Sequence, residues 1–249
     1  MATEPAEGPG ETMTENASTD MTDAGDSAAF RDDFDPGWEQ RQTAWRVATW
    51  KQNGTQMAPE RCATDGEGHM VQTVLPGEPY RGGSMQTADE YPYGRWTARL
   101  RPSSVPGVLN SMFTMDWDDH TTPDNEHDGS KFEVDIEFLT YTFGPDTGEV
   151  HLAVHVPEKK GLFVEDVDLD FNPSDAFHQW SIEIAPDRVT WYVDGEVLRT
   201  FERPEGYAFP PNYEFFFNSW TDANPNWING PAEETATYHI DWVEFEPAG

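Results

Sequence analysis

Three acidic residues stand two positions apart in one short segment. Glu133, Asp135 and Glu137 alternate with apolar residues in KFEVDIEFL, residues 131–139. In an extended strand the three carboxylates would share one face, with Cα atoms ~6–7 Å apart per step. Like charges so placed raise the pKa of one member, and a carboxylate beside a carboxylic acid is what glycoside hydrolysis requires. A plain polar strand face is the competing interpretation, and the pattern alone does not decide between them.

A strand with such a row must lie in a sheet, and the rest of the chain is typical of one. Several segments alternate apolar and polar residues, and Asp194-Gly195 between two of them is a strong hairpin signal. We find no amphipathic helix and no internal repeat. The sequence therefore predicts an all-β fold, a β-sandwich, with strands in residues 93–100, 180–184, 189–193, 196–201, 213–218 and 237–245.

Composition divides the 249 residues into a tail and one domain. Residues 1–29 are acidic and have almost nothing apolar to bury, so we expect a disordered tail or linker there. Residues 30–249 are expected to form the domain, because 20 Gly, 20 Pro and 13% aromatic residues fit short strands joined by tight turns. Cys62 is the only cysteine, so no internal disulfide can form.

Acidic residues dominate the charge balance. The 47 Asp and Glu against 15 Lys and Arg give a formal net charge of −32, a field that excludes nucleic acid and anionic membranes as partners. Concentrated salt screens such self-repulsion, and lysine is scarce, so we expect a salt-adapted, halophilic protein; an ordinary acidic protein is the alternative. The chain has no apolar run long enough to span a membrane, and its first residues do not resemble a signal peptide.

Two acidic segments could in principle bind a cation. Residues 116–128 are better explained as a solvated loop of a salt-adapted chain. Residues 166–170, DVDLD, begin like a calcium-binding EF-hand loop. The segment lacks glycine at the sixth position and glutamate at the twelfth, so we reject that interpretation and expect a half-exposed strand.

Four segments together resemble glycoside hydrolase family 16. Residues 133–139 are similar to its E-x-D-x-E signature in the form without an extra residue. YGRW (93–96), NSW (218–220) and IDWV (240–243) resemble its other recurrent segments, in the same order. The resemblance covers most of the chain from about Phe30 onward. It implies a β-jelly-roll sandwich of two antiparallel sheets with a concave substrate cleft, and a retaining endo-β-glycosidase of a β-linked polysaccharide, most similar to β-1,3-1,4- or β-1,3-glucanases.

The resemblance also implies roles for single residues. Glu133 matches the nucleophile, Asp135 the assisting carboxylate and Glu137 the acid/base, and catalysis needs no cofactor. A structural calcium ion is implied at Asp241, Gly66 and Asp33, although an ordinary strand-terminal aspartate explains the first equally well. Aromatic rings that stack on sugars and amides that bind hydroxyls are implied at further cleft positions. These substrate contacts are Asn218, Trp220, Trp227, Phe113, Asn53, Gln86 and His155, with both tryptophans assigned to the polar loop around residues 221–226.

Lys131 departs from the family pattern, in which lichenase-like members have an aromatic residue two positions before the nucleophile. Its ammonium group could bind an acidic substituent of the glycan, or it could neutralise part of the carboxylate cluster. Ser84, Ala153 and His155 also replace typical sugar-binding side chains, and a lone Cys62 cannot form the disulfide usual in lichenases. These differences leave the glucan specificity open.

Three functions remain open on the sequence alone. The first is a hydrolase; the second is a transglycosylase that uses the same site to pass the glycosyl group to a sugar. The third is a carbohydrate-binding jelly roll without turnover, against which the three clustered acids argue. The resemblance further implies a secreted, extracellular protein with a polysaccharide as its partner, and we expect a monomer.

Overall fold

The computed structural model describes residues 29–41, 43–117, 131–157, 159–223 and 225–249. The tail predicted for residues 1–29 lies outside them except for its last residue. The predicted acidic loop lies outside them beyond Trp117. Asp116, which we assigned to that loop, is instead part of a strand, β10 (Leu109–Trp117).

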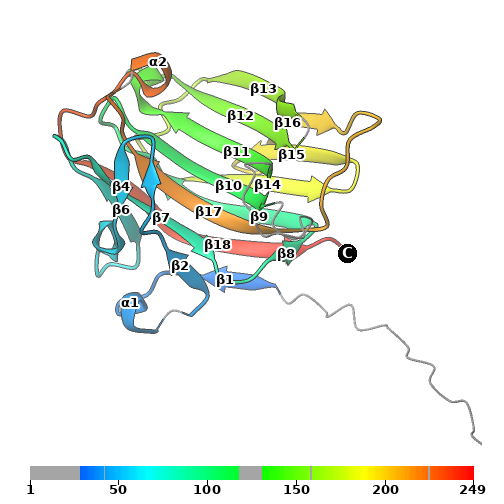
Figure 1. Ribbon diagram of the computed structural model, residues 1–249, viewed down its shortest axis with the longest axis horizontal. Coiled ribbons are helices and arrows are strands. Elements are labelled where there is room, and N and C mark those ends of the chain that lie inside the picture. The colour runs from blue at the N-terminus through cyan, green and yellow to red at the C-terminus, as the bar shows by residue number, and fades with distance from the viewer. Residues whose placement is uncertain (1–28, 42, 118–130, 158, 224) are drawn as a thin grey trace, which may run out of the picture.

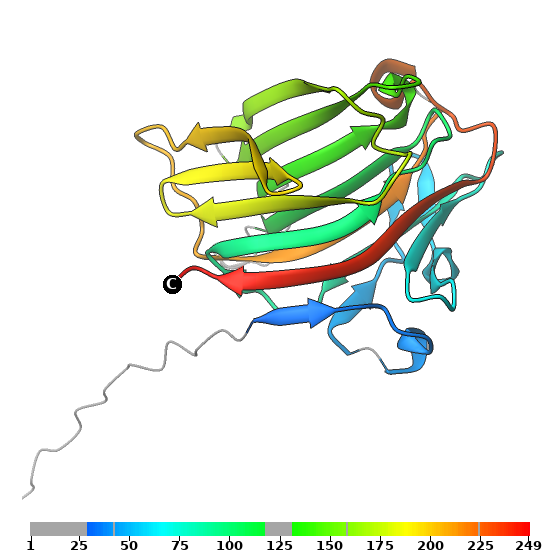
Figure 2. The same ribbon diagram turned by 180° about the vertical axis from the view of Figure 1, so that it is seen from behind.

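Two β-sheets pack face to face as a sandwich (Figures 1 and 2). We call one the cleft sheet. Its order is β13 (Lys159–Leu169), β12 (Gly148–Val156), β11 (Lys131–Leu139), β10, β17 (Asn212–Trp220), β7 (Arg81–Thr87), β4 (Thr55–Met57) and β3 (Lys51–Gln52), with β2 (Trp45–Val47) on β7 and β8 (Tyr91–Pro92) on β17.

The second sheet, which we call the outer sheet, lies nearer to the viewer in Figure 2. Its order is β16 (Glu196–Glu202), β15 (Arg188–Val193), β14 (His178–Ala185), β9 (Gly94–Arg101), β18 (Ala236–Pro247), β6 (Met70–Val74) and β5 (Cys62–Thr64), with β1 (Phe30–Asp32) on β18.

Helices contribute little to the described part of the chain. The α-helices there are α1 (Trp38–Arg41) and α2 (Pro225–Ile228), with 4 residues each, and neither could cross a membrane. Short 3₁₀ turns occur at η1 (Pro59–Arg61) and η3 (Thr140–Thr142). The fold is therefore the predicted all-β jelly-roll sandwich.

Five of the six strand segments predicted from alternation fall within strands of the structure, and the sixth, 93–100, does so except for Tyr93, which precedes β9. The predicted hairpin turn also forms, because Asp194 and Gly195 adopt the positive φ angles of 49° and 84° that such a two-residue turn requires. Residues 166–169 lie in β13, as a strand rather than a calcium loop, and Asp170 follows its end. Alternation thus identified most of the outer sheet and the central part of the cleft sheet.

Large aromatic side chains fill the space between the two sheets. Trp96, Trp180 and Trp191 are at most 1% exposed, and Trp96 stacks on Phe215 with ring centroids 4.3 Å apart. Each such ring removes roughly 150–250 Å² from water, which makes this core the main source of stability. The rigid core supports the face of the cleft sheet that points away from it.

Close packing between strands is enforced near the cysteine. Cys62 on β5 is buried, and a Cβ atom on Gly83 of β7 would lie 2.9 Å from its Sγ and 2.8 Å from the carbonyl oxygen of Arg61. Only glycine allows this approach. The two sheets therefore meet tightly at this end of the sandwich.

Candidate active site

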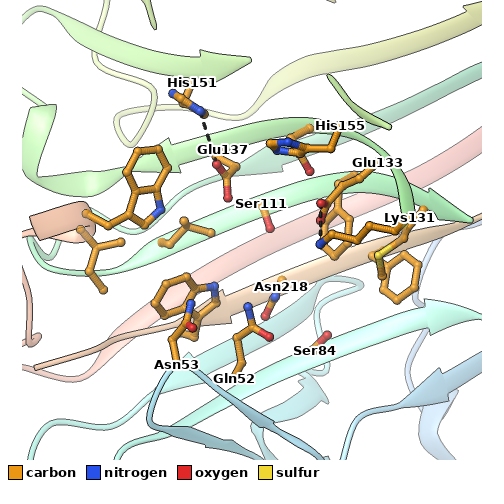
Figure 3. A pocket seen from close by; sticks show the side chains of 18 of the residues that line it. Gln52, Asn53, Ser84, Ser111, Lys131, Glu133, Glu137, His151, His155 and Asn218 are labelled. Atoms are coloured by element: carbon orange, nitrogen blue, oxygen red, sulfur yellow. Dashed lines mark ion pairs between the residues drawn. The ribbon is translucent and has the colours of Figure 1, made fainter. Parts of the chain in front are cut away.

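The three acids of β11 project from the cleft sheet into an open cleft, where Figure 3 shows Glu133 and Glu137. The cleft has a volume of about 1020 Å³, and Glu133, Asp135 and Glu137 all line it. The alternation of β11 turns them there, because every second residue is apolar and buried in the core between the sheets. Those apolar residues are Phe132, Val134, Ile136 and Phe138, each at most 2% exposed.

Strand pairing places a row of side chains beside each acid. Residues directly opposite one another on antiparallel strands project to the same face of the sheet. Each carboxyl group is thereby flanked by a residue of β12 on one side and of β10 on the other. The rows are His155 and Met115 with Glu133; Ala153, Phe113, Phe216 and Gln86 with Asp135; and His151, Ser111, Asn218 and Ser84 with Glu137.

Glu137 has the environment of a proton donor. Burial raises the pKa of its carboxyl group well above the usual value, and the charges of Asp135 and then Glu133 raise it further, against smaller opposing effects of His155 and Lys131. Its side chain nevertheless remains 22% exposed, toward the cleft. A carboxylic acid that keeps its proton and reaches the cleft can protonate a leaving oxygen.

His151 backs Glu137. Its Nδ1 donates a hydrogen bond of 2.5 Å to Oδ1 of Asp166 on β13, which points Nε2 toward Glu137, 3.9 Å from Oε2. The edge of the ring also packs against Trp227 of α2, with ring centroids 4.7 Å apart. His151 therefore links the acid to the wall of the cleft.

Asp135 is the most enclosed of the three acids, at 4% exposure. Burial raises the pKa of its carboxyl group well above the usual value, and the charge of Glu133 adds to the shift. His155 accepts a hydrogen bond of 2.7 Å at Nδ1 from the backbone N–H of Gly161, so its own proton sits on Nε2, 3.4 Å from Oδ2 of Asp135. Burial, with Lys131 and Lys160 contributing, lowers the pKa of His155, which favours this neutral form.

Glu133 forms an ion pair with Lys131, whose Nζ lies 2.6 Å from Oε2 (Figure 3). The glutamate side chain is 15% exposed and the lysine side chain 32% exposed. This contact supports the interpretation that Lys131 neutralises part of the carboxylate row. It presents Glu133 to the cleft as an anion, the state that a nucleophile needs.

Exposed aromatic rings stand at the cleft walls. Trp50, next to β3, and Trp227 are 43% and 39% exposed. Both line the cleft, so a bound ligand could cover their exposed apolar surface. Flat rings of this kind suit the apolar faces of sugars. Asn218 adds a buried Oδ1 that accepts no hydrogen bond from any described residue and so fits a donor from a bound hydroxyl.

The cleft brings together every substrate contact predicted from the sequence. Two placements differ from expectation: Trp220 is the last residue of β17 rather than part of a loop, and Trp227 lies in α2. Trp220 packs in a small apolar cluster at 4% exposure, which limits the ring face it can offer. The roles in sugar binding remain predictions, for Asn218, Trp220, Trp227, Phe113, Asn53, Gln86, His155 and Lys131.

Several lining residues were missed by the sequence reasoning. One available signal was Asn53-Gly54, whose positive φ angles of 43° and 94° form the turn between β3 and β4 and so place the residues before it at the cleft. Another was the even spacing of His151 and His155, which puts both on one face of β12. The missed residues that the site uses are Trp50, Lys51, Gln52, Ser111, His151, Lys160 and Asp222.

The residues proposed for calcium adjoin one stretch of β18. Asp241 is the extra residue at an irregularity in the pairing of β18 with β9, Asp33 follows β1, and Gly66 lies in the turn before β6. However, Arg99 forms an ion pair with Asp241, and Arg31 lies 2.6 Å from Asp33. A guanidinium group on each carboxylate disfavours a cation there, so the residues fit calcium poorly and its binding remains only a prediction.

One other group of described residues has converging metal-ligand atoms outside the cleft. Asp65, His69 and His239 place such atoms within 4.8 Å of one another. Asp65 already accepts a hydrogen bond of 2.7 Å from Nδ1 of His69. It also accepts hydrogen bonds from two backbone N–H groups, which organise the turn before β6. Burial and the nearby Arg101 lower the pKa of His239, and that same positive charge opposes a bound cation. The contacts therefore explain this group without a metal.

A carboxylate and a protonated carboxylic acid side by side, on the open face of a jelly roll, are the groups that cleave glycosidic bonds. The fold and the site thus define a glycoside hydrolase. The chain belongs to the glycosyl hydrolases family 16, whose family model matches residues 40–244.

Known proteins agree with this assignment. A β-glucanase of Brevibacillus brevis is 28% identical over 231 residues, 88% of this chain and 82% of the relative. A β-glucanase of Bacillus subtilis is 27% identical over 200 residues, 79% of this chain and 74% of the relative. Among solved structures, a β-glucanase of Bacillus licheniformis superposes with a TM-score of 0.72 at 20% identity, over 88% of this chain and 98% of that one, which shows the shared fold.

Proposed function

We propose that this protein is a retaining endo-hydrolase of a β-linked glucan, with Glu133 as the nucleophile and Glu137 as the acid/base. The observation that carries the proposal is the contrast between the two glutamates on β11. Glu133 is ion-paired to Lys131 as a carboxylate, whereas burial and two acidic neighbours keep the proton on Glu137. A nucleophile and an acid on one strand face are what a double displacement requires.

The chemistry follows from those two states. Glu133 attacks the anomeric carbon while Glu137 gives its proton to the leaving oxygen, and a covalent glycosyl-enzyme forms. Glu137, now a carboxylate, then takes a proton from a water molecule, and this water attacks the same carbon and releases Glu133. Two inversions restore the original configuration. Asp135 lies between the two glutamates and can share a proton with either neighbour, which tunes both steps.

The substrate class rests on the cleft and on the relatives. Lining residues come from β3 at one edge of the cleft sheet and from β13 at the other, so the cleft spans the sheet's width and suits the interior of a polymer. The relatives from Brevibacillus brevis and Bacillus subtilis are named β-glucanases. A β-1,3-1,4- or β-1,3-linked glucan is the substrate that this combination favours. A polymer of this kind is met outside the cell, so the proposal includes an extracellular, monomeric enzyme.

Hydrolysis of defined polymers tests the proposal. Purified protein is incubated with mixed-linkage β-glucan and with laminarin, in low and in molar KCl, and reducing ends and product sizes are measured. We expect chain shortening with retained anomeric configuration in the first product seen by NMR. Inverted configuration would refute the assigned mechanism. In a parallel incubation with a defined β-glucan oligosaccharide, products longer than that oligosaccharide would instead identify a transglycosylase.

A further inference from the structure

The lysines of this chain are concentrated in its active-site cleft. The sequence contains four, and three of them, Lys51, Lys131 and Lys160, line the cleft. Lys159, the fourth lysine, is the neighbour of Lys160 in the sequence but does not line the cleft. Several arginines form ion pairs elsewhere, as Arg199 does with Glu165, and no arginine of the described residues lines the cleft.

Two of these ammonium groups gather at the end of the cleft where Glu133 lies. Lys131 contacts Glu133 directly, and Lys160 precedes Gly161, whose N–H binds His155. His155 lies opposite Glu133 in the pairing of β11 with β12, so Lys160 and Lys131 stand on β13 and β11, the two strands that flank this histidine. Lys51 is on β3, at the opposite side of the cleft beside the exposed Trp50.

Neutralisation of the catalytic acids explains the presence of only one of the three cleft lysines. Lys131 pairs with Glu133, but neither Lys51 nor Lys160 forms an ion pair with any described residue, and both side chains are exposed. The net charge of the whole chain is −32, so most of its surface repels anions and has almost no lysine. Because three of the four lysines line the cleft, they would favour the binding of a negatively charged chain there.

A neutral glucan offers these groups hydroxyl oxygens as acceptors but no opposite charge. Ammonium ions are strongly hydrated point charges, and contact with an uncharged sugar would strip water from them without a compensating charge. A carboxylate or a sulfate ester on the sugar supplies that charge and forms charge-assisted hydrogen bonds. Lysine, unlike arginine, needs no planar partner, so it accommodates substituents of either geometry.

We infer that the natural substrate is an anionic β-linked polysaccharide, whose negative substituents are bound by Lys160 and Lys131 at one side of the cleft and by Lys51 at the other. The inference rests on the proposed function, since it specifies the polymer that the same carboxyl groups cleave. Lys131 then has two tasks, as partner of Glu133 and as part of the anion-binding end.

Three versions of one polymer test the inference. They are mixed-linkage β-glucan, the same polymer with part of its primary hydroxyls oxidised to carboxylates, and the same polymer partly sulfated. We expect kcat/KM at fixed KCl to be higher for at least one anionic version than for the neutral one, by roughly fivefold per engaged ammonium group. The carboxylated and sulfated versions distinguish the two sources of charge.

Two neighbouring lysines provide matched variants. Lys160→Met should lower the anionic-to-neutral ratio of kcat/KM by roughly fivefold. Lys159→Met removes the same charge one residue away, outside the cleft, and should leave that ratio unchanged. Retention of Glu133→Gln protein on gels containing each polymer gives the same comparison without turnover.

The outcomes separate the inference from the function on which it rests. If all three polymers are cleaved equally well and Lys160→Met leaves their ratio unchanged, the inference is overturned while the proposed hydrolase stands. If no polymer is cleaved and none retains the protein, the proposed function falls and the inference falls with it.

Discussion

Asp135 should set the pH at which the enzyme loses activity on the alkaline side. Two unit charges ~7 Å apart, the spacing of alternate residues in a strand, interact by about 2.4 kcal/mol at an effective dielectric constant of ~20. At about 1.36 kcal/mol per pKa unit, that is nearly two units. Burial and the charge of Glu133 raise the pKa of Asp135 itself, which reduces the mean negative charge that it places beside Glu137. We therefore expect Asp135→Asn to lower the pKa of Glu137 by roughly one unit.

The sign follows from the role of Glu137 as an acid. The negative charge of Asp135 raises the pKa of Glu137, so its removal lets Glu137 lose its proton at lower pH. The alkaline limb of the pH profile of kcat/KM should move down by about one unit, alongside a lower maximal rate. Initial rates on a soluble β-glucan, measured across the pH range at constant ionic strength, provide the assay.

A matched control removes the same charge elsewhere. Asp168 is an exposed carboxylate on β13 of the same sheet and does not line the cleft. Asp168→Asn should leave the alkaline limb where it is, because solvent and salt screen the distant charge. An alkaline limb that stays in place in Asp135→Asn, or that moves to higher pH, would show that Glu137 is not the coupled acid.

Other predictions concern catalysis, packing and salt. Glu137→Ala should lose activity on β-glucan but recover part of it with azide on an activated aryl glycoside, where the product is a glycosyl azide; no rescue would assign the acid elsewhere. Trp191→Phe should cost about 1–3 kcal/mol, because it removes a 3.0 Å hydrogen bond from Nε1 to the backbone oxygen of Asp135 as well as buried volume. Trp180→Phe is the matched control, since its Nε1 is buried without a hydrogen-bond partner among the described residues; equal losses of Tm would refute a role for the bond. Tm should rise with KCl over the molar range, because screening relieves the charge of −32, and a flat trend would mean that the acids serve only solubility.

The outer sheet could be predicted from alternation because one of its faces meets water. Strands such as β14 and β18 have polar residues outside and apolar residues inside, which is the pattern that reveals a strand. The sequence reasoning missed β7, β10 and β12, which are buried on nearly every residue. Residues such as Phe113 and Met115 fill the cleft face and pack on Phe216, so alternation disappears there.

The candidate site divides in the same way. Glu133, Asp135 and Glu137 could be found because their spacing within one strand is a local property. The partners His151 and Ser111 depend on which strands pair and in what register, and nothing local in the sequence states that Ser111 lies opposite Glu137. Trp50 was missed for a related reason, since its position depends on how the β3–β4 hairpin meets the sheet.

The single cysteine makes it possible to measure how often the two sheets separate at one end of the sandwich. Cys62 is 4% exposed, and burial raises the pKa of its thiol to about 12, so in the folded protein it is neither accessible nor ionised. Its Sγ is packed against Gly83 of the other sheet. Thiol-reactive probes will therefore label this position only in molecules that have opened at this end of the sandwich. The labelling rate in increasing KCl would report how salt changes the free energy of that opening, through one thiol per molecule.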